Sequence, residues 1–256
     1  MPDNPNGDVT LTYTDNGVAI ISFYHPAQNS LPSVLLDTLS FRIKEAGENA
    51  QTRLIVLKSE GDRTFCAGAS FDELLLIKDK EAGAQFFSGF ANVINACRSS
   101  PKIIIARVQG KAVGGGVGLA AAADYCLATA AAAIKLSELA IGIGPFVISP
   151  AVIRKIGLSA FSQLTIRATD FQTAQWAKDK GLYNEVYADI AELDEALNAF
   201  TDKLASYHPE ALNGLKQILW EGTANWNELL KDRAAISGKL VLSEFTQQAL
   251  QSFLKK

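Results

Sequence analysis

The first part of the chain carries short apolar runs that are typical of β-strands. Residues 9–14 and 18–23 are rich in β-branched side chains and flank Asp15-Asn16-Gly17, which predicts a β-hairpin with an Asn-Gly turn. The runs at 54–57 and 103–108 are apolar throughout, as expected for strands that are buried on both faces.

Helical spacing of apolar residues begins between these runs and later takes over the chain. Residues 31–48 and 80–98 repeat apolar positions at intervals of three and four, which predicts two amphipathic helices. After Pro150, helical spacing dominates, and only 185–187 indicates a late strand. The expected later helices are 151–156, 159–167, 172–180, 190–206, 209–220, 224–237 and 242–254.

This order of elements predicts an α/β fold followed by a helical C-terminal segment. We expect two parts, a core of strands and helices over 1–190 and a helical oligomerisation segment over 191–256. No strict repeat and no low-complexity linker marks the boundary between them.

Composition narrows the possible function classes. Hydrophobic residues make up 48% of the chain and charged residues 20%, as in ordinary globular proteins. A net charge of −3 argues against a nucleic-acid partner, which selects a basic face. No apolar run reaches the roughly 18 residues that span a membrane, and the start of the chain lacks a secretory signal pattern. A cytoplasmic protein is therefore expected.

The few cysteines and histidines exclude other chemistry. Cys66, Cys97 and Cys126 are odd in number and have no metal-ligand spacing, so we expect free thiols. His25 and His208 are the only histidines, which leaves little material for a metal site or a Ser-His-Asp triad. We expect no metal and no tightly bound cofactor.

Two glycine-containing turns follow buried strands and precede helices. Phe65-Cys-Ala-Gly-Ala-Ser-Phe71 comes after the strand at 54–57, and Val113-Gly-Gly-Gly-Val117 comes after the strand at 103–108. Glycine allows close approach of the backbone to a ligand, and a helix N-terminus presents N–H groups without acceptors. Two such turns on neighbouring strands could direct two N–H groups at one oxygen, as in an oxyanion hole.

Each turn also has a simpler interpretation. Either could serve only tight packing, and the Gly114–Gly116 triplet could bind phosphate. The phosphate interpretation is weak because no Gly-Lys-Ser/Thr follows the triplet. The joint placement of the two turns favours the oxyanion hole.

At this point the sequence resembles the crotonase superfamily, the enoyl-CoA hydratase/isomerase family. The resemblance runs through most of the chain and rests on segments that occur in the family's order and spacing. These are Asn16–Pro26, Thr64-Phe-Cys-Ala-Gly-Ala69, Gln109-Gly-Lys-Ala-Val-Gly-Gly-Gly116, Ala123-Asp124-Tyr125 and Ile134-Lys-Leu-Ser-Glu138 with Gly142 and Pro145 after it.

The resemblance implies a spiral of strand–strand–helix units, a C-terminal helical trimerisation segment, and a trimer or dimer of trimers. It implies an acyl-CoA substrate, with Ala69 and Gly115 as oxyanion donors and Glu138 as the acid/base. It also implies a set of residues that bind the substrate or its coenzyme A portion: Ala27, Ala67, Gly68, Gly114, Gly118, Pro145, Phe146, Phe253 and Lys256. For Glu138 the alternative is a surface glutamate at the end of a strand, since most glutamates are exposed.

Two departures from the family pattern leave the reaction open. Family hydratases carry a further glutamate two residues after the glycine triplet, where this chain has Gly118. Pro145-Phe-Val-Ile-Ser149 stands where the family usually has Pro-Gly-x-Gly-Gly, so we expect Phe146 to narrow the pocket. One carboxylate suits double-bond isomerisation, because it can move a proton between two carbons.

Other functions remain open at this stage. Hydration is conceivable with one glutamate and a backbone-held water. The room expected at Gly118 could also admit a carboxylated, glutaconyl-type thioester for decarboxylation, hydration or dehydration, with Lys111 or Arg107 as a possible partner for its charge. A non-catalytic acyl-CoA binder and a purely structural helical protein are the remaining alternatives.

Overall fold

The computed structural model describes the backbone of residues 4–254 and the side chains of residues 4–252. Its main sheet has six strands in the order β1-β2-β4-β7-β9-β11, in which only the β1–β2 pair is antiparallel. The predicted hairpin is confirmed, with Tyr13 pairing with Ala19 next to the turn. The strands are β1 (Asp8–Tyr13), β2 (Val18–Tyr24), β4 (Leu54–Ser59), β7 (Ile104–Val108), β9 (Tyr125–Thr129) and β11 (Glu185–Tyr187).

Five very short strands form two smaller sheets beside the main one. A three-stranded sheet has the order β10-β8-β5, and β3 pairs with β6. These strands are β3 (Ser30–Leu31), β5 (Thr64–Cys66), β6 (Gly68–Ala69), β8 (Lys111–Val113) and β10 (Ile134–Lys135). Most were not predicted, because two or three residues are too few to display a period along the sequence.

The strands and helices form repeating strand–strand–helix units. In three successive units, β4–β5, β7–β8 and β9–β10 each place one strand in the main sheet and the next in the smaller sheet. A helix follows each pair after a turn or short segment. The predicted α/β fold with a spiral of such units is therefore confirmed.

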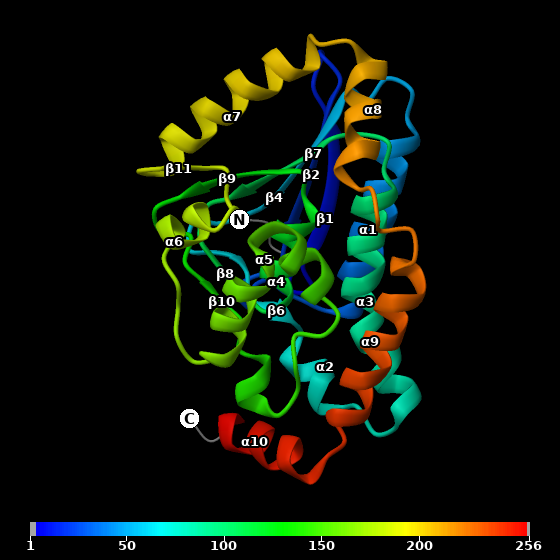
Figure 1. Cartoon of the computed structure of the whole chain (residues 1–256), viewed down its shortest axis with the longest axis vertical. Coiled ribbons are helices and arrows are strands. Elements are labelled where there is room, and N and C mark those ends of the chain that lie inside the picture. Colours follow the sequence, from blue (N-terminus) through cyan, green and yellow to red (C-terminus); the bar gives the residue numbers. More distant parts are fainter. Residues whose placement is uncertain (1–3, 255–256) are drawn as a thin grey trace.

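The helices surround the sheets (Figure 1). Predicted boundaries hold to within a few residues, and the helices predicted at 151–156 and 159–167 form one element, kinked at Gly157, whose φ is 73°. The helices are α1 (Ser33–Glu48), α2 (Phe71–Leu75), α3 (Lys80–Ser99), α4 (Gly115–Ala122), the 3₁₀ helix η1 (Glu138–Ile141), α5 (Ser149–Ile166), α6 (Ala174–Asp179), α7 (Ile190–Ala205), α8 (Pro209–Leu219), α9 (Trp226–Leu240) and α10 (Glu244–Leu254).

The C-terminal helices pack on the rest of the chain (Figure 1). On α7, Leu193 and Leu197 join a buried cluster with Leu54, Val56 and Ile105 of the main sheet. The helices α3 and α9 touch so closely that a Cβ added to Gly83 would lie 2.7 Å from the Cα of Gly238. The segment 191–256 thus shares buried clusters with the core, and the division at residue 190 stays a prediction.

A buried ion pair joins α8 to the centre of the fold. Lys216 on α8 donates through Nζ to Asp124 Oδ2 at 2.7 Å and to the Cys97 carbonyl oxygen at 2.8 Å. Asp124 also accepts hydrogen bonds from the Trp220 indole and the Ile104 N–H. The side chains of Lys216 and Asp124 are 1% and 2% exposed, so this pair is shielded from solvent screening.

Candidate active site

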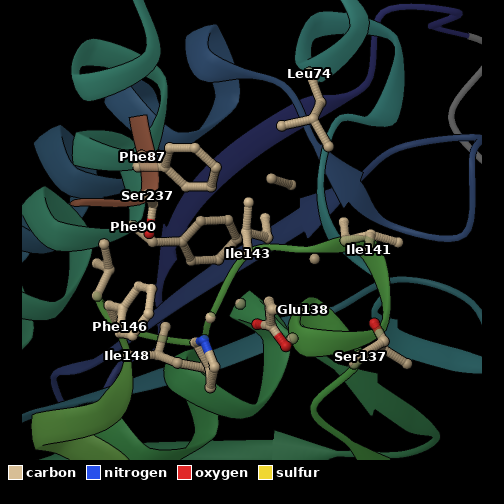
Figure 2. A pocket seen from close by; sticks show the side chains of 18 of the residues that line it. Leu74, Phe87, Phe90, Ser137, Glu138, Ile141, Ile143, Phe146, Ile148 and Ser237 are labelled. Atoms are coloured by element: carbon tan, nitrogen blue, oxygen red, sulfur yellow. The ribbon is translucent and has the colours of Figure 1, made fainter. Parts of the chain in front are cut away.

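The two glycine turns, α2, α3 and the segment around η1 enclose a mostly apolar cavity of about 160 Å³ (Figure 2). Such a volume is close to that of a cavity that holds benzene, about 150 Å³, so it accommodates a group of about six carbon atoms. The lining residues are Ala67, Gly68, Ala69, Phe71, Leu74, Phe86, Phe87, Phe90, Val113, Gly114, Gly115, Ser137, Glu138, Ile141, Ile143, Gly144, Pro145, Phe146, Val147, Ile148 and Ser237.

The first turn presents the N–H of Ala69 on the side away from its partner strand. Ala69 pairs with Leu31 of β3, and the Ser70 N–H donates to the Leu31 carbonyl at 3.0 Å. Because successive N–H groups of a strand alternate in direction, the Ala69 N–H faces away from β3. Gly68 has a φ of 97°, a conformation that side chains other than glycine rarely adopt.

The second turn presents the N–H of Gly115 at the start of α4. The Gly114 N–H donates a hydrogen bond to the Lys135 carbonyl oxygen at 2.9 Å. Gly115 is the first residue of the helix. The N–H of a first helical residue has no acceptor within its helix. A Cβ added to Gly68 would lie 3.6 Å from the Gly115 nitrogen, so the two turns are in contact.

The carboxyl group of Glu138 lies against the second turn. A Cβ added to Gly114 would lie only 2.9 Å from Glu138 Oε1, so a residue larger than glycine would collide with this carboxyl. Glu138 as a residue is only partly buried, but its Oε2 atom is buried and has no hydrogen-bond partner among the described residues. In Figure 2 it lies among the lining residues, between Ser137 and Phe90.

Burial gives this carboxyl an unusual acidity. Loss of solvent raises the pKa of Glu138 from 4.5 to about 7, and the only opposing contribution is a hydrogen bond from its own backbone. A group with a pKa near neutrality can both accept and return a proton at physiological pH. The structure therefore contradicts the alternative of an ordinary surface glutamate.

The expectation of free space at Gly118 is wrong. Gly118 lies in α4, is buried and does not line the cavity. A Cβ added to it would lie 2.4 Å from Cγ2 and 2.8 Å from Cβ of Ile148, so Ile148 fills the space beside it. Ile148 thus occupies the space that a side chain at position 118 would take, and this leaves no room for a substrate carboxylate.

Replacing Gly118 tests this packing. We expect Gly118→Ala to lose about 2 kcal/mol of unfolding free energy. An added Cβ only 2.4 Å from Ile148 Cγ2 places the overpacking cost near the upper end of the usual range of about 1–3 kcal/mol, and the better helix propensity of alanine returns about 1 kcal/mol. The measurement is urea denaturation. Ile148→Ala destabilises the chain by itself, but in that background Gly118→Ala should cost less than in the wild type, because the added methyl group then enters the space that Ile148 leaves. An unchanged midpoint for Gly118→Ala alone would contradict the observed packing.

The segment after η1 closes another wall of the cavity. Pro145 and Phe146 both line it, and a Cβ added to Gly144 would lie 2.4 Å from the Phe146 ring. The Phe146 ring thus forms part of the cavity wall, and the narrowing of the pocket relative to the family stays a prediction.

The two cationic side chains that were expected to pair with a substrate carboxylate interact with other residues instead. Arg107 forms a bidentate pair with Asp194, and Lys111 lies 5.2 Å from the centre of the Phe171 ring. Glu138 is the only charged side chain among the described residues that line the cavity. A carboxylated acyl group would therefore enter without a cation to pair with.

The cysteines have a structural role. Cys66, Cys97 and Cys126 are free, as predicted, and all three are buried. Burial raises the pKa of Cys66, beside the first turn, to about 12, so its thiol stays protonated and is a poor nucleophile.

Three predicted coenzyme-binding residues lie away from the cavity or outside the described region. Ala27 is exposed, and its N–H donates to His25 Nδ1 at 3.3 Å. The side chain of Phe253 and the whole of Lys256 lie outside the described residues. Their role in binding coenzyme A stays a prediction.

Several lining residues were not predicted. An aromatic wall of the cavity is formed by three residues of α3, namely Phe86, Phe87 and Phe90. Their helical spacing in the sequence could have indicated that they share one face of this helix. Ser237 of α9 also lines the cavity, although nothing in the sequence distinguishes it from other helical serines.

Within residues 4–254, no cluster of side chains has the composition of a metal site. None of the helices in this range is long and apolar enough to cross a bilayer.

Known proteins resemble this chain in both sequence and structure. The family model for enoyl-CoA hydratase/isomerase matches residues 13–256. A Bacillus subtilis protein named "Probable enoyl-CoA hydratase" is 31% identical over 94% of each chain. The short-chain-enoyl-CoA hydratase of Clostridium acetobutylicum is 27% identical over 93% of this chain and 92% of its own.

The mouse mitochondrial methylglutaconyl-CoA hydratase matches a smaller part of the chain, with 32% identity over 78% of this chain and 64% of that protein. The crystal structure of an enoyl-CoA hydratase from Bacillus halodurans superposes with a TM-score of 0.88 at 20% identity, covering 95% of this chain and 99% of the other. That likeness shows the fold. The family match over nearly the whole chain shows in addition that this protein is an enzyme of the enoyl-CoA hydratase/isomerase family, within the crotonase superfamily.

Proposed function

We propose that the protein is an enoyl-CoA isomerase that moves a carbon–carbon double bond along an acyl-CoA chain. In this proposal Glu138 is the only acid/base, and the N–H groups of Ala69 and Gly115 bind the thioester oxygen. The observation that carries the proposal is a single buried carboxyl in the cavity, with Ile148 filling the place at Gly118 where a second carboxyl would stand.

The chemistry needs one base and one anion site. The Glu138 carboxylate removes a proton from C2 of a 3-enoyl thioester, and the electron pair moves toward the thioester oxygen to give a dienolate. The two backbone N–H groups stabilise this oxygen, and each such donor is worth about 2.7–4 kcal/mol. Glu138 then returns the proton to C4, which leaves the double bond between C2 and C3.

The raised pKa of Glu138 predicts the pH dependence of this reaction. The base form is present above a pKa of about 7, so kcat/KM should rise about tenfold per pH unit below that value and level off above it. The measurement is the initial rate of isomerisation of 3-hexenoyl-CoA between pH 5 and pH 9. A profile that is flat from pH 5 to pH 7 would exclude Glu138 as the base.

Hydration is the second candidate, favoured by the names of the relatives. It ordinarily requires two carboxylates to position and activate water, and the described cavity holds one. The ethylmalonyl-CoA decarboxylase of Xenopus tropicalis is a partial relative, 29% identical over 54% of this chain. A carboxylated substrate has less support, because no lysine or arginine lines the described cavity.

Isotope transfer separates these reactions sharply. In D₂O, 3-hexenoyl-CoA should give 2-hexenoyl-CoA in which part of the product keeps the original proton at C4, because the buried carboxyl exchanges slowly with solvent. Mass spectrometry of the product measures this retention. A separate assay measures the hydration of 2-hexenoyl-CoA to 3-hydroxyhexanoyl-CoA. If its kcat/KM exceeds that for the isomerisation of 3-hexenoyl-CoA, the protein is a hydratase and the isomerase proposal is wrong.

We also propose a homotrimer or a dimer of trimers, as the family resemblance implies. Exposed apolar side chains on α8 and α5 support an oligomeric surface; they are Leu158, Ile166, Leu215 and Ile218. Light scattering on the full chain would measure the assembly, and a monomer at micromolar concentration would exclude it.

A further inference from the structure

One polar side chain in the cavity has no role in the proposed proton transfer. Ser237 of α9 lines the cavity, is 1% exposed, and its Oγ atom is buried without a hydrogen-bond partner among the described residues. A buried hydroxyl without a partner is unfavourable, so such groups in folded proteins call for an explanation.

The hydroxyl of Ser237 differs from those of Ser88 and Ser99, two other serines within helices, because it has no backbone acceptor. Helical serines normally bond to the carbonyl of the preceding turn, as Ser88 does with the Ala84 oxygen and Ser99 with the Asn95 oxygen, at 2.7 and 2.8 Å. No such bond is present for Ser237. Its hydroxyl is therefore available to a molecule in the cavity.

The surroundings of Ser237 are apolar. It belongs to the same cavity wall as Phe86, Phe87 and Phe90, and in Figure 2 it lies beside Phe87 and Phe90. Glu138 lines the same cavity and lies on the other side of the Phe90 ring in this view. Because the two turns, Glu138 and Ser237 line one cavity of about 160 Å³, a thioester held at the turns can bring the far end of its acyl chain to Ser237.

We propose that Ser237 selects acyl chains that carry an uncharged oxygen, a hydroxyl or a keto group, at their distal end. This inference rests on the proposed function, because the oxyanion turns fix which end of the acyl group lies near Glu138. A hydroxyl can donate to a keto oxygen and can both donate to and accept from another hydroxyl.

The charge of the cavity excludes an acidic group at this place. Glu138 is the only charged side chain among the described lining residues, and no lysine or arginine joins them. A carboxylate held by one serine hydroxyl would be buried without a counter-charge, which is strongly unfavourable. A neutral oxygen matches the single hydroxyl.

A purely structural explanation is also specific enough to test. Ser237 adjoins Gly238, where α9 touches Gly83 of α3, so its small size could serve the contact of the two helices. Alanine is as small as serine but has no hydroxyl. Ser237→Ala thus keeps the helix contact and removes only the hydrogen-bonding group.

Binding of saturated thioesters tests the inference without requiring turnover. Calorimetry on the full chain would compare hexanoyl-CoA with 4-, 5- and 6-hydroxyhexanoyl-CoA for the wild type and Ser237→Ala. At one or more hydroxyl positions, the substitution should weaken binding roughly tenfold while leaving hexanoyl-CoA affinity unchanged. Ser137→Ala removes the other serine hydroxyl of the cavity wall, next to Glu138, and should leave the ratio of the two affinities unchanged.

The outcomes separate this inference from the proposed function. Equal affinities of wild type and Ser237→Ala for all three hydroxylated thioesters would overturn the role of Ser237 and leave the isomerase proposal standing. Failure of the wild type to bind hexanoyl-CoA would overturn both. Isomerisation of 3-hexenoyl-CoA, measured separately, tests the proposed function alone.

Discussion

Glu138→Gln should lower kcat for 3-hexenoyl-CoA isomerisation about 10³-fold. The amide keeps the shape of the carboxyl but can neither take a proton from C2 nor return it to C4, and general acid–base catalysis is typically worth 10²–10⁴. KM should change little, because the apolar walls and backbone N–H groups that hold the substrate remain. Steady-state rates at pH 8 measure both constants.

Stability provides the control for this variant. Between pH 4.5 and about 7 the folded state binds more protons at Glu138 than the unfolded state, so the stability of the wild type falls as pH rises through this window. The full effect corresponds to about 3 kcal/mol. Glutamine does not titrate, so Glu138→Gln should gain about 3 kcal/mol relative to the wild type on going from pH 4 to pH 8.

The two readouts together identify the role of the carboxyl. Loss of rate with a pH-dependent gain of stability indicates a group held at an energetic cost for its chemistry. A variant that keeps wild-type rates would show that another group is the base. A relative stability that does not change between pH 4 and pH 8 would show that Glu138 is ordinarily solvated.

Much of the fold could be predicted because its long elements show their periods in the sequence. The amphipathic helix at Lys80–Ser99 and the apolar strand at Ile104–Val108 lie within a few residues of their predicted bounds. The strands of two or three residues that shape the site, such as β6 at Gly68–Ala69, were missed. Their existence depends on pairing with distant segments, which one sequence does not display.

The site was predictable where backbone chemistry requires a particular residue type. Gly114 has a φ of 55° and lies against the Glu138 carboxyl. The positive φ and the lack of space for a Cβ both require glycine. Contacts between distant side chains were not predictable. Free space was expected at Gly118 because Ile148, which fills it, lies 30 positions later in the sequence. Ser237 is separated even further from the turns.

Lys216→Met should lower the unfolding free energy by about 3–5 kcal/mol. Methionine replaces the apolar stem of the lysine but removes the ammonium group that contacts Asp124 directly. Breaking one side of a buried pair is strongly destabilising, and the more distant attraction of Arg154 and Lys155 offsets only part of the loss. Asp124 would keep its hydrogen bonds from Ile104 and Trp220, which donate to it at 2.7 and 2.6 Å. Urea denaturation at pH 7 measures the loss.

Asp124→Asn combined with Lys216→Met provides the matched control, because it removes both charges from the buried pair. The double variant should be more stable than Lys216→Met alone, since the uncompensated charge rather than the lost contact accounts for most of the destabilisation. Hydrogen exchange should locate the effect in α8, whose Lys216 also holds the Cys97 carbonyl at the end of α3. A loss below about 1 kcal/mol for Lys216→Met would show that the pair contributes no more to stability than an ordinary surface ion pair. In that case apolar packing, rather than the ion pair, would hold α8 in place.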